Sequence, residues 1–93
     1  MSEKVVHQKV TIFNQRGLHA RAAAKLVQRA GAFHADIEIT RNETTVNATS
    51  IMGLMMLAAA QGTEVEITAH GEDAKDAVAA LVSLISDRFE EDE

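Results

Sequence analysis

The stretch NQRGLHARAAAKLV, residues 14–27, joins a strand pattern to a helix pattern and places one histidine, His19, at the junction. Before it, apolar and polar residues alternate over residues 6–13, which predicts a half-buried strand. After it, apolar residues recur at helical spacing over residues 20–30, and Gly31 is a stop signal of the C′ type. The stretch therefore predicts a strand, a turn and an amphipathic helix that begins directly after the histidine.

The same two periodicities continue toward the C-terminus. The further expected elements are, in chain order, a strand over residues 35–39, a turn over 41–43 in which Asn42 tolerates positive φ, a return strand over 44–48, a short apolar helix over 51–60 capped by Ser50, a strand over 65–69, and a helix from about Ala74 that ends near Phe89. The last four residues, EEDE, are expected to be frayed and solvated. This β-α-β-β-α-β-α order predicts an α+β fold, an open-faced two-layer sandwich in which helices cover one face of the sheet.

The composition is that of one small globular domain. The 93 residues suffice for a single domain over residues 1–93, since 46% of them are hydrophobic and 25% are charged. The absence of cysteine excludes disulfides and thiolate metal sites and favours the cytoplasm. The first ten residues lack the apolar core of a signal peptide, and the longest apolar region, residues 51–60, is too short to span a bilayer. We therefore expect a cytoplasmic protein that does not act in a membrane.

Charge is unevenly distributed along the chain. The formal net charge is −5, but residues 1–35 carry +5 and residues 36–93 carry −10. No carboxylate lies between Glu3 and Asp36, so the region around His19 should attract anions. The cations that flank the histidine are Arg16, Arg21, Lys25 and Arg29. An ordinary solvated basic helix face is the alternative explanation for such a cluster.

His19 occupies the expected N-cap of the first helix. The first N–H groups of a helix, here beginning with that of Ala20, lack internal acceptors, and together with the helix dipole they form a site for a tetrahedral anion. The same positive end disfavours an imidazolium, so a ring nitrogen keeps a lone pair and could act as a nucleophile. A phosphoryl group on that ring would meet the backbone donors and the guanidinium of Arg21. The alternative is that His19 is only a helix cap or a solvated side chain.

Other function classes find little support in the sequence. The remaining histidines, His7, His34 and His70, lack comparable surroundings. No H-x-x-x-H or H-E-x-x-H spacing and no glycine-rich nucleotide loop exists, so we expect neither a metal nor a cofactor. Aromatic residues are too few for stacking on nucleic acid; they are Phe13, Phe33 and Phe89, the last expected in the third helix. No acidic residue lies near His19 in sequence, which argues against a hydrolytic triad but leaves open a partner distant in the chain.

Three blocks of the chain carry a family resemblance. GLHAR at residues 17–21, SIMGLMMLA at 50–58 and QGTEVEITAHGEDAKDAV at 61–78 resemble the HPr family, the histidine phosphocarriers of the bacterial phosphotransferase system. The resemblance implies an antiparallel four-stranded sheet in the order first, fourth, second, third strand. It also implies that His19 accepts a phosphoryl group on Nδ1 from phosphorylated enzyme I and passes it to a IIA protein or domain, with Arg21 beside it. Such a protein is a carrier and not a stand-alone enzyme, and we expect a monomer.

One residue departs from the family motif. Proline usually follows the arginine, whereas this chain has Ala22, which keeps a backbone donor and has high helix propensity. Phosphate binding should survive this change. The stretch HARAAAK resembles carriers of nitrogen-type or regulatory systems at least as much as carriers for sugar transport, so both branches stay open.

Ser50 has two interpretations. As an N-cap it stabilises the second helix. It also matches the regulatory serine that HPr kinase/phosphorylase modifies in some bacteria, and a phosphate there would place charge beside Ile51 and Met52. The alternative function is therefore a regulatory HPr-like protein that acts mainly through Ser50 phosphorylation and protein binding. Regulators of that kind lack the histidine, so the presence of His19 counts against this alternative.

The second helix is apolar nearly all round, and only one of its stripes can be buried on a sheet. Leu54 and Leu57 are the expected core residues. The resemblance places partner docking on the other side of this helix and around the histidine. The docking candidates are Arg16, Ala20, Lys25, Gln28, Ile51, Met52 and Met55. Without the resemblance, the methionines would be assigned to the core.

Overall fold

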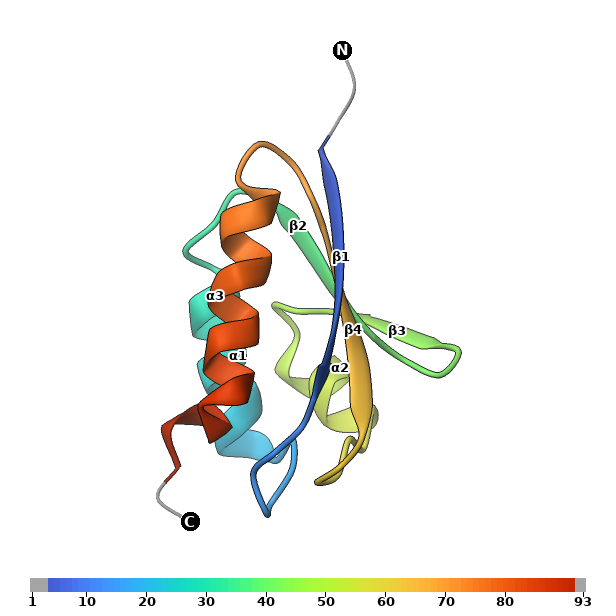
Figure 1. Cartoon of the computed structure of the whole chain (residues 1–93). Helices are drawn as coiled ribbons and strands as arrows, with labels where there is room; N and C mark the ends of the chain where they lie inside the picture. The colour runs from blue at the N-terminus through green and yellow to red at the C-terminus, as the bar shows by residue number, and fades with distance from the viewer. Residues whose placement is uncertain (1–3, 92–93) are drawn as a thin grey trace.

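The computed structural model describes residues 4–91, which form a four-stranded antiparallel sheet with the helices on one face (Figure 1). The strand order β1-β4-β2-β3 confirms the order implied by the resemblance. The elements are β1 (Val5–Thr11), α1 (Ala20–Ala30), β2 (Asp36–Arg41), β3 (Thr44–Asn47), α2 (Ile51–Met56), β4 (Glu64–His70), α3 (Ala74–Ser86) and a short 3-10 helix, η1 (Arg88–Glu90). Over residues 4–91, no helix combines the length and the apolar character needed to cross a membrane.

The sheet is built around β4, which lies between β1 and β2 and pairs with both. Val10 pairs with Val65 across β1 and β4, and Ile39 pairs with Ile67 across β2 and β4. Directly opposed residues point to the same face of a sheet, so these pairs stand together. All four side chains are buried, which shows that the alternation in the sequence does mark the core face.

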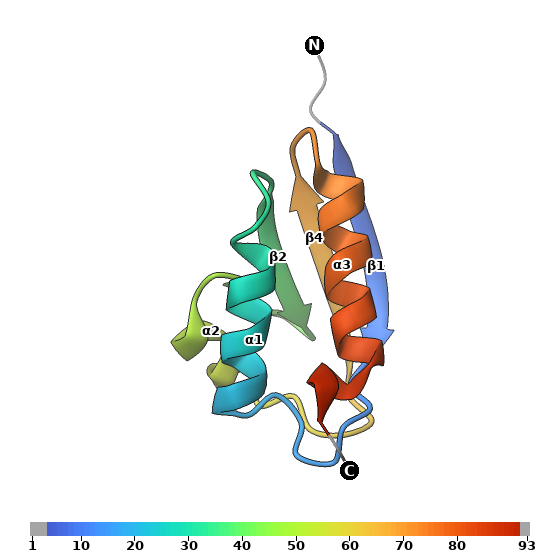
Figure 2. The same ribbon diagram turned by 90° about the vertical axis from the view of Figure 1, so that its left-hand side faces the viewer.

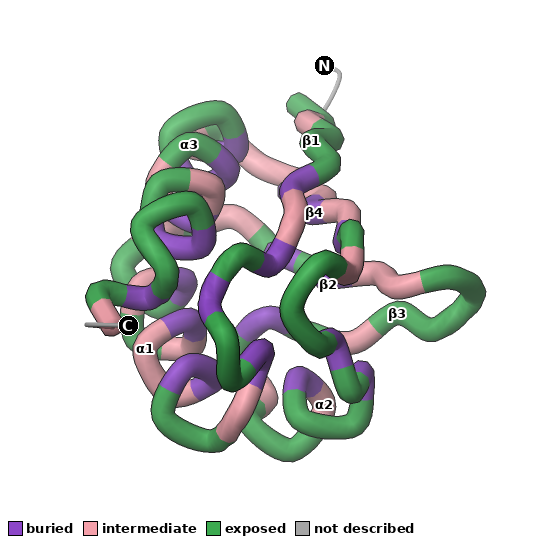
Figure 3. The backbone as a smooth tube through the Cα atoms, turned by 60° about the horizontal axis from the view of Figure 1, so that its bottom comes forward, coloured by how far each residue is buried: buried purple, intermediate pink, exposed green. Residues whose placement is uncertain are grey.

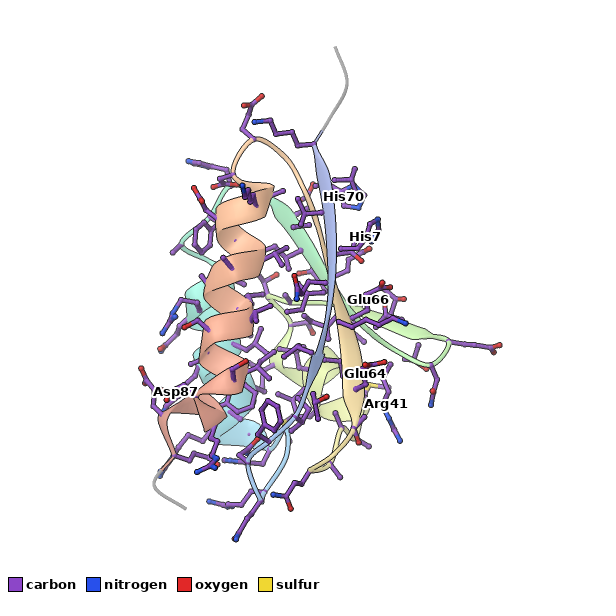
Figure 4. The ribbon with its side chains drawn as sticks, in the orientation of Figure 1. His7, Arg41, Glu64, Glu66, His70 and Asp87 are labelled. Carbon is purple, nitrogen blue, oxygen red and sulfur yellow. The ribbon has the colours of Figure 1, made fainter. Side chains whose placement is uncertain are left out.

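The opposite face of the sheet carries polar side chains and no helix. His7, Glu64 and Glu66 project from it, away from the helices (Figure 4). Arg41, at the end of β2, instead donates from Nη1 to Leu57 O after α2, at 2.9 Å. His7 Nδ1 lies 3.1 Å from Thr68 Oγ1 on the neighbouring strand, at hydrogen-bond distance. The predicted open-faced, two-layer arrangement is therefore confirmed.

The helical layer consists of α1 and α3 side by side, with α2 beyond α1 (Figure 2). α1 turns alanines toward the core, and Ala22 and Ala23 are fully buried. Because alanine has no side chain beyond Cβ, the backbone of α1 can approach its neighbours α2 and α3 closely. The tube in Figure 3 shows the result from below, with buried segments facing inward and most of α2 exposed.

Left-handed residues decide where two turns form. Asn42 has φ 55° in the β2–β3 turn, as predicted. Ala58 has φ 52° and stops α2 at Met56, so the prediction that this helix reaches residue 60 is wrong. Gly31 ends α1 as predicted, and its φ of −66° is ordinary right-handed backbone, so the helix stops there without a left-handed residue.

The C-terminal end differs most from expectation. α3 ends at Ser86, and Phe89 lies in η1 rather than in α3, fully buried. Arg88, Phe89 and Glu90 all have positive φ, between 55° and 64°, at a cost of about 1–2 kcal/mol for each residue. Burial of the Phe89 side chain offsets part of this cost. The hydrogen bond from Lys25 Nζ to Phe89 O, at 2.7 Å, holds the turn against α1.

Candidate functional site

His19 lies at the N-cap of α1, in extended backbone with φ −83° and ψ −179°. Its carbonyl oxygen accepts the first helical hydrogen bond, from Ala23 N at 2.8 Å. Its ring accepts a second bond, from Arg21 N to Nδ1 at 3.3 Å. The predicted cap is therefore present, and Nδ1 lies among the free N–H groups of the first turn.

The loop before α1 fixes the approach of His19. Gly17 has φ +68°, and a Cβ at this position would lie 2.6 Å from Ala59 O, so only glycine fits without displacing backbone. The next residue, Leu18, is buried and donates its N–H to Ala59 O at 2.9 Å. The turn is thus anchored to the segment that follows α2.

A carboxylate from the far end of the chain meets the histidine ring. Glu91 Oε2 accepts a short hydrogen bond from His19 Nε2, and Glu91 Oε1 accepts one from Asn14 Nδ2 at 3.0 Å. Asn14 Nδ2 also donates to Gly17 O at 2.8 Å. The Glu91 side chain is only 10% exposed, so the predicted solvated tail is wrong at this residue. Asp92 and Glu93, the rest of that prediction, lie outside the described residues.

The partners of the ring define which nitrogen carries hydrogen. The backbone N–H of Arg21 can only donate, so Nδ1 accepts and holds a lone pair. Burial alone would raise the pKa of Glu91, but hydrogen bonds from His19 and Asn14 and the electrostatic attraction of the His19 ring and Arg16 outweigh it and lower that pKa. Glu91 is therefore an ionised carboxylate at neutral pH, which can only accept. Nε2 must then be the nitrogen that carries hydrogen.

Sequence reasoning missed Glu91 because the contact joins residues 72 positions apart. The acidic run EEDE has the composition of a solvated tail. One signal was available: Phe89 is the only aromatic residue after Phe33, and a large apolar side chain beside an acidic run indicates that the chain returns to the core.

The basic residues around the site fall into two groups. Arg16 and Arg21 are exposed, and the Arg21 guanidinium makes no hydrogen bond or ion pair within residues 4–91. Lys25 and Arg29 face η1 instead, where they pair with Glu90 at 3.7 and 3.8 Å. Of the other docking candidates on this helix, Ala20 and Gln28 are exposed. Arg16 and Arg21 are therefore available to an incoming anion, whereas Lys25 and Arg29 already pair with Glu90.

α2 presents an apolar surface next to the site. Leu54 and Leu57 are buried, whereas Ile51, Met52 and Met55 are 41%, 74% and 45% exposed. The two leucines therefore lie in the core and the three other side chains on the surface, as predicted. Met56, which the sequence did not single out, is 76% exposed and extends the same surface. We call the surface formed by Ile51, Met52, Met55 and Met56 the α2 patch.

Ser50 caps α2 as predicted. Its Oγ accepts a hydrogen bond from Gly53 N at 3.0 Å, and its backbone is extended. A Cβ on Gly53 would lie 3.1 Å from this oxygen, so the glycine leaves room for the cap. Ser50 is half-buried and directly precedes Ile51, the first residue of the α2 patch.

Other hollows and clusters contribute little chemistry. A shallow depression of about 500 Å³ is lined by residues such as Lys9, Thr40, Arg41 and Glu66 and is separate from His19. Among residues 4–91, no three His, Cys, Asp or Glu side chains form a group that could hold a metal ion. The chemistry of the described part of the chain therefore centres on His19.

Comparison with known proteins points to one family. Residues 6–87 match the family model described as PTS HPr component phosphorylation site. The chain is 46% identical over 89 residues to phosphocarrier protein HPr of Neisseria meningitidis serogroup A and 47% identical over 89 residues to that of Cupriavidus necator, and both matches cover 96% of this chain and 100% of the relative. The crystal structure of HPr-C-His from Thermoanaerobacter tengcongensis has a TM-score of 0.85 at 42% identity and covers 100% of both chains. The chain therefore belongs to the HPr family of phosphocarrier proteins of the phosphotransferase system.

Proposed function

We propose that His19 is the residue that carries the phosphoryl group, that phosphorylated enzyme I donates the group, and that a IIA protein or domain receives it. The observation that supports this assignment is the orientation of the ring at the start of α1. Nδ1 accepts from Arg21 N and so presents a lone pair, while Nε2 is bound to Glu91. In this role the chain works as a cytoplasmic carrier, a single domain over residues 1–93, and not as a stand-alone enzyme.

The transfer forms one N–P bond and breaks another bond to phosphorus. The Nδ1 lone pair attacks phosphorus, and the electron pair of the breaking bond stays with the donor atom of enzyme I. The hydrogen on Nε2 stays in place, so the ring of His19 becomes positively charged as the new bond forms. Transfer to the IIA partner reverses these changes: the N–P bond breaks, its electron pair returns to Nδ1, and the ring becomes neutral again.

Three donor groups of this chain would stabilise the phosphoryl oxygens. Arg21 N, which now donates to Nδ1, lies beside the new N–P bond, as does the free N–H of Ala20 at the first position of α1. The exposed Arg21 guanidinium can donate to two oxygens at once. Positioning and charge stabilisation of this kind account for most of the catalysis in phosphoryl transfer, and the partner supplies the remainder.

The test of this assignment follows phosphate incorporation from phosphoenolpyruvate in the presence of enzyme I. The wild-type protein should gain one acid-labile phosphate, and His19→Ala should gain none, because phosphohistidine is the expected product. His7→Ala is the matched control, since His7 lies on the open face of the sheet and should incorporate phosphate at the wild-type rate (Figure 4). Phosphate that is still incorporated by His19→Ala would overturn the assignment.

The partner surface is proposed to combine the exposed side of α1 with the α2 patch. A small apolar surface beside basic residues suits brief contacts with acidic partner surfaces. In a titration of isotope-labelled protein with enzyme I, amide signals of residues 20–29 and 51–55 should shift. Signals in these two segments that stay in place while binding occurs would show that the partner docks elsewhere.

Ser50 supports a second, regulatory function for the same chain. A phosphate on Ser50 Oγ would remain near the amides of α2, which favours it electrostatically, but would place negative charge at the edge of the α2 patch. With ATP and HPr kinase/phosphorylase, the wild-type protein should gain an acid-stable phosphate and Ser50→Ala should not. A protein that gains phosphate only in this second assay would be a regulator and not a carrier.

A further inference from the structure

The hydrogen bonds around His19 form a continuous chain of four groups. Asn14 Nδ2 donates to Glu91 Oε1, Glu91 Oε2 accepts from His19 Nε2, and His19 Nδ1 accepts from Arg21 N. Each link is compatible with only one direction of donation, because a side-chain NH₂ and a backbone N–H donate and an ionised carboxylate accepts. The chain therefore fixes both the hydrogen on Nε2 and the lone pair on Nδ1.

Glu91 reaches this position through a strained segment. Arg88, Phe89 and Glu90 all lie in the left-handed region, and the buried Phe89 ring and the bond from Lys25 Nζ to Phe89 O hold them there. Figure 2 shows η1 turning back beneath α1 and α3 toward the loop that precedes α1. Left-handed backbone is unfavourable for these side chains, so the surrounding packing must hold the segment that presents Glu91 to the ring.

Asn14 is a second unusual residue in the chain of hydrogen bonds. Its side chain is fully buried, and its Oδ1 has no hydrogen-bond partner within residues 4–91. A buried carbonyl without a partner is unfavourable, yet the other end of the same amide uses both of its donors, on Gly17 O and Glu91 Oε1. The amide thus fixes the loop before His19 and orients the Glu91 carboxylate together.

We propose that Glu91, oriented by Asn14, is a positioning residue for phosphoryl transfer, which holds His19 with its hydrogen on Nε2 and its Nδ1 directed toward the start of α1. This inference rests on the proposed function of His19. During attack on phosphorus the ring gains positive charge while keeping the Nε2 hydrogen, and the adjacent carboxylate compensates that charge. Glu91 touches neither the phosphoryl group nor the donor, so it acts only through the ring.

The first test observes the ring directly by NMR in the unphosphorylated protein. In the wild type, the hydrogen on Nε2 should be protected from exchange with water and give a low-field signal that correlates with Nε2. Glu91→Ala should lose that signal, and Glu91→Gln should weaken it, because the amide oxygen can still accept but carries no charge. Glu72→Gln makes the same change in the β4–α3 loop at the opposite end of the molecule and should leave the signal intact (Figure 1).

The second test measures phosphoryl transfer from enzyme I with the same proteins. Loss of a hydrogen bond to a charged group should slow the maximal rate for Glu91→Ala by about 10- to 100-fold. KM for the protein as substrate of enzyme I should stay near the wild-type value, because the α2 patch and the arginines are unchanged. Glu91→Ala should lose only the stability that the Glu91 hydrogen bonds contribute, and its amide signals away from His19 and Asn14 should stay in place. A general loss of folding would instead disturb amide signals throughout the protein.

The outcomes separate this inference from the proposed function. Wild-type transfer rates in Glu91→Ala, or a faster rate, would overturn the positioning role while leaving His19 as the carrier; the faster rate would mean that Glu91 restrains the ring. A wild-type protein that accepts no phosphate from enzyme I would instead overturn the proposed function itself. Asn14→Ala should reproduce part of the Glu91→Ala loss, because the carboxylate then loses its bond to Asn14 Nδ2.

Discussion

The two helix starts that carry the proposed phosphorylation sites are built alike but connected differently. His19 and Ser50 are both extended N-caps, and each accepts a hydrogen bond from the first turn of its own helix, at 3.3 Å for Nδ1 and 3.0 Å for Oγ. The second polar atom of the His19 ring, however, is bound to Glu91, 72 residues away. The cap bond of Ser50 reaches only three residues along the chain.

Because of this difference, a change at each site should affect a different part of the molecule. A change at Ser50 alters a helix of six residues and the exposed apolar side chains beside it. A change at His19 reaches the loop before α1 and, through Glu91, the turn that follows α3. We therefore expect perturbations of the C-terminal turn to affect the histidine cap and to leave the serine cap unchanged.

The largest effect should come from removing the anchor of the C-terminal turn. Phe89→Ala should lower the free energy of unfolding by about 3–5 kcal/mol, because a fully buried aromatic ring is lost and a cavity is left. The turn should then release Glu91 and remove the protected Nε2 hydrogen of His19, while amide exchange at Gly53 keeps reporting an intact Ser50 cap. Urea unfolding and NMR measure both effects.

Phe13 provides the matched control for this comparison. It is 48% exposed, so Phe13→Ala should cost about 1 kcal/mol or less and leave the ring signal of His19 in place. Equal losses of stability in the two variants would show that Phe89 is not a specific anchor. An unaltered His19 signal in Phe89→Ala would show that Glu91 does not depend on the turn.

The same contrast explains how much could be predicted from the sequence. The strands and the start of α1 were predictable because alternation, helical spacing and capping residues are signals carried by neighbours in the chain. The Ser50 cap, the burial of Leu54 and Leu57 and the exposure of Met52 followed from the same kind of pattern combined with a family resemblance.

The remaining features depend on contacts between distant segments. α2 stops early because Ala58 adopts left-handed backbone, which brings Ala59 O to the N–H of Leu18. Glu91 joins the site because Phe89 is buried against the core, although its own sequence neighbours are acidic. No local pattern encodes either arrangement, so periodicity and capping rules could not find them.

Acid should expose the contribution of Glu91 to stability. Because the pKa of Glu91 is lower in the folded protein, its contribution is complete above the unfolded value of about 4.3 and is lost as the pH falls through the lower folded value. At pH 6, the free energy of unfolding of Glu91→Gln should be about 1–2 kcal/mol lower than that of the wild type, because a hydrogen bond to a charged group contributes about this much. The two proteins should converge as the pH falls through the lowered pKa of Glu91 in the folded protein.

Urea unfolding across this pH range, with Glu72→Gln as a control, measures the effect. The control removes an exposed carboxylate from the loop between β4 and α3 and should follow the wild-type curve at every pH. A wild-type advantage over Glu91→Gln that grows on acidification would have the wrong sign and would contradict an ionised Glu91 bound to His19.

Ser50→Ala should have a smaller and purely local effect. Loss of the bond between Oγ and Gly53 N removes one N-cap, which costs about 1 kcal/mol. Faster exchange of the Gly53 amide should accompany the loss, with no change in the Nε2 signal of His19. Ser50→Thr retains a hydroxyl and should recover most of the stability; if it fails to do so, the cap is not the reason for the loss.

The smallest effect is expected where this chain departs from the family motif, inside the first turn of α1. Ala22 is the third residue of that turn, and its N–H is among those without an intrahelical acceptor, so Ala22→Pro removes no helical hydrogen bond. The cap bond to His19 Nδ1 uses Arg21 N and also survives. The free energy of unfolding should change by about 1 kcal/mol or less, with the cost arising from fitting a proline ring at a fully buried position.

Ala23→Pro is the matched control for this prediction. Ala23 N donates to His19 O at 2.8 Å, so proline one residue later should cost about 3 kcal/mol and slow phosphoryl transfer as well. Equal costs at the two positions, measured by urea unfolding, would mean that the first turn of α1 is held by packing of its alanines and not by the cap at His19.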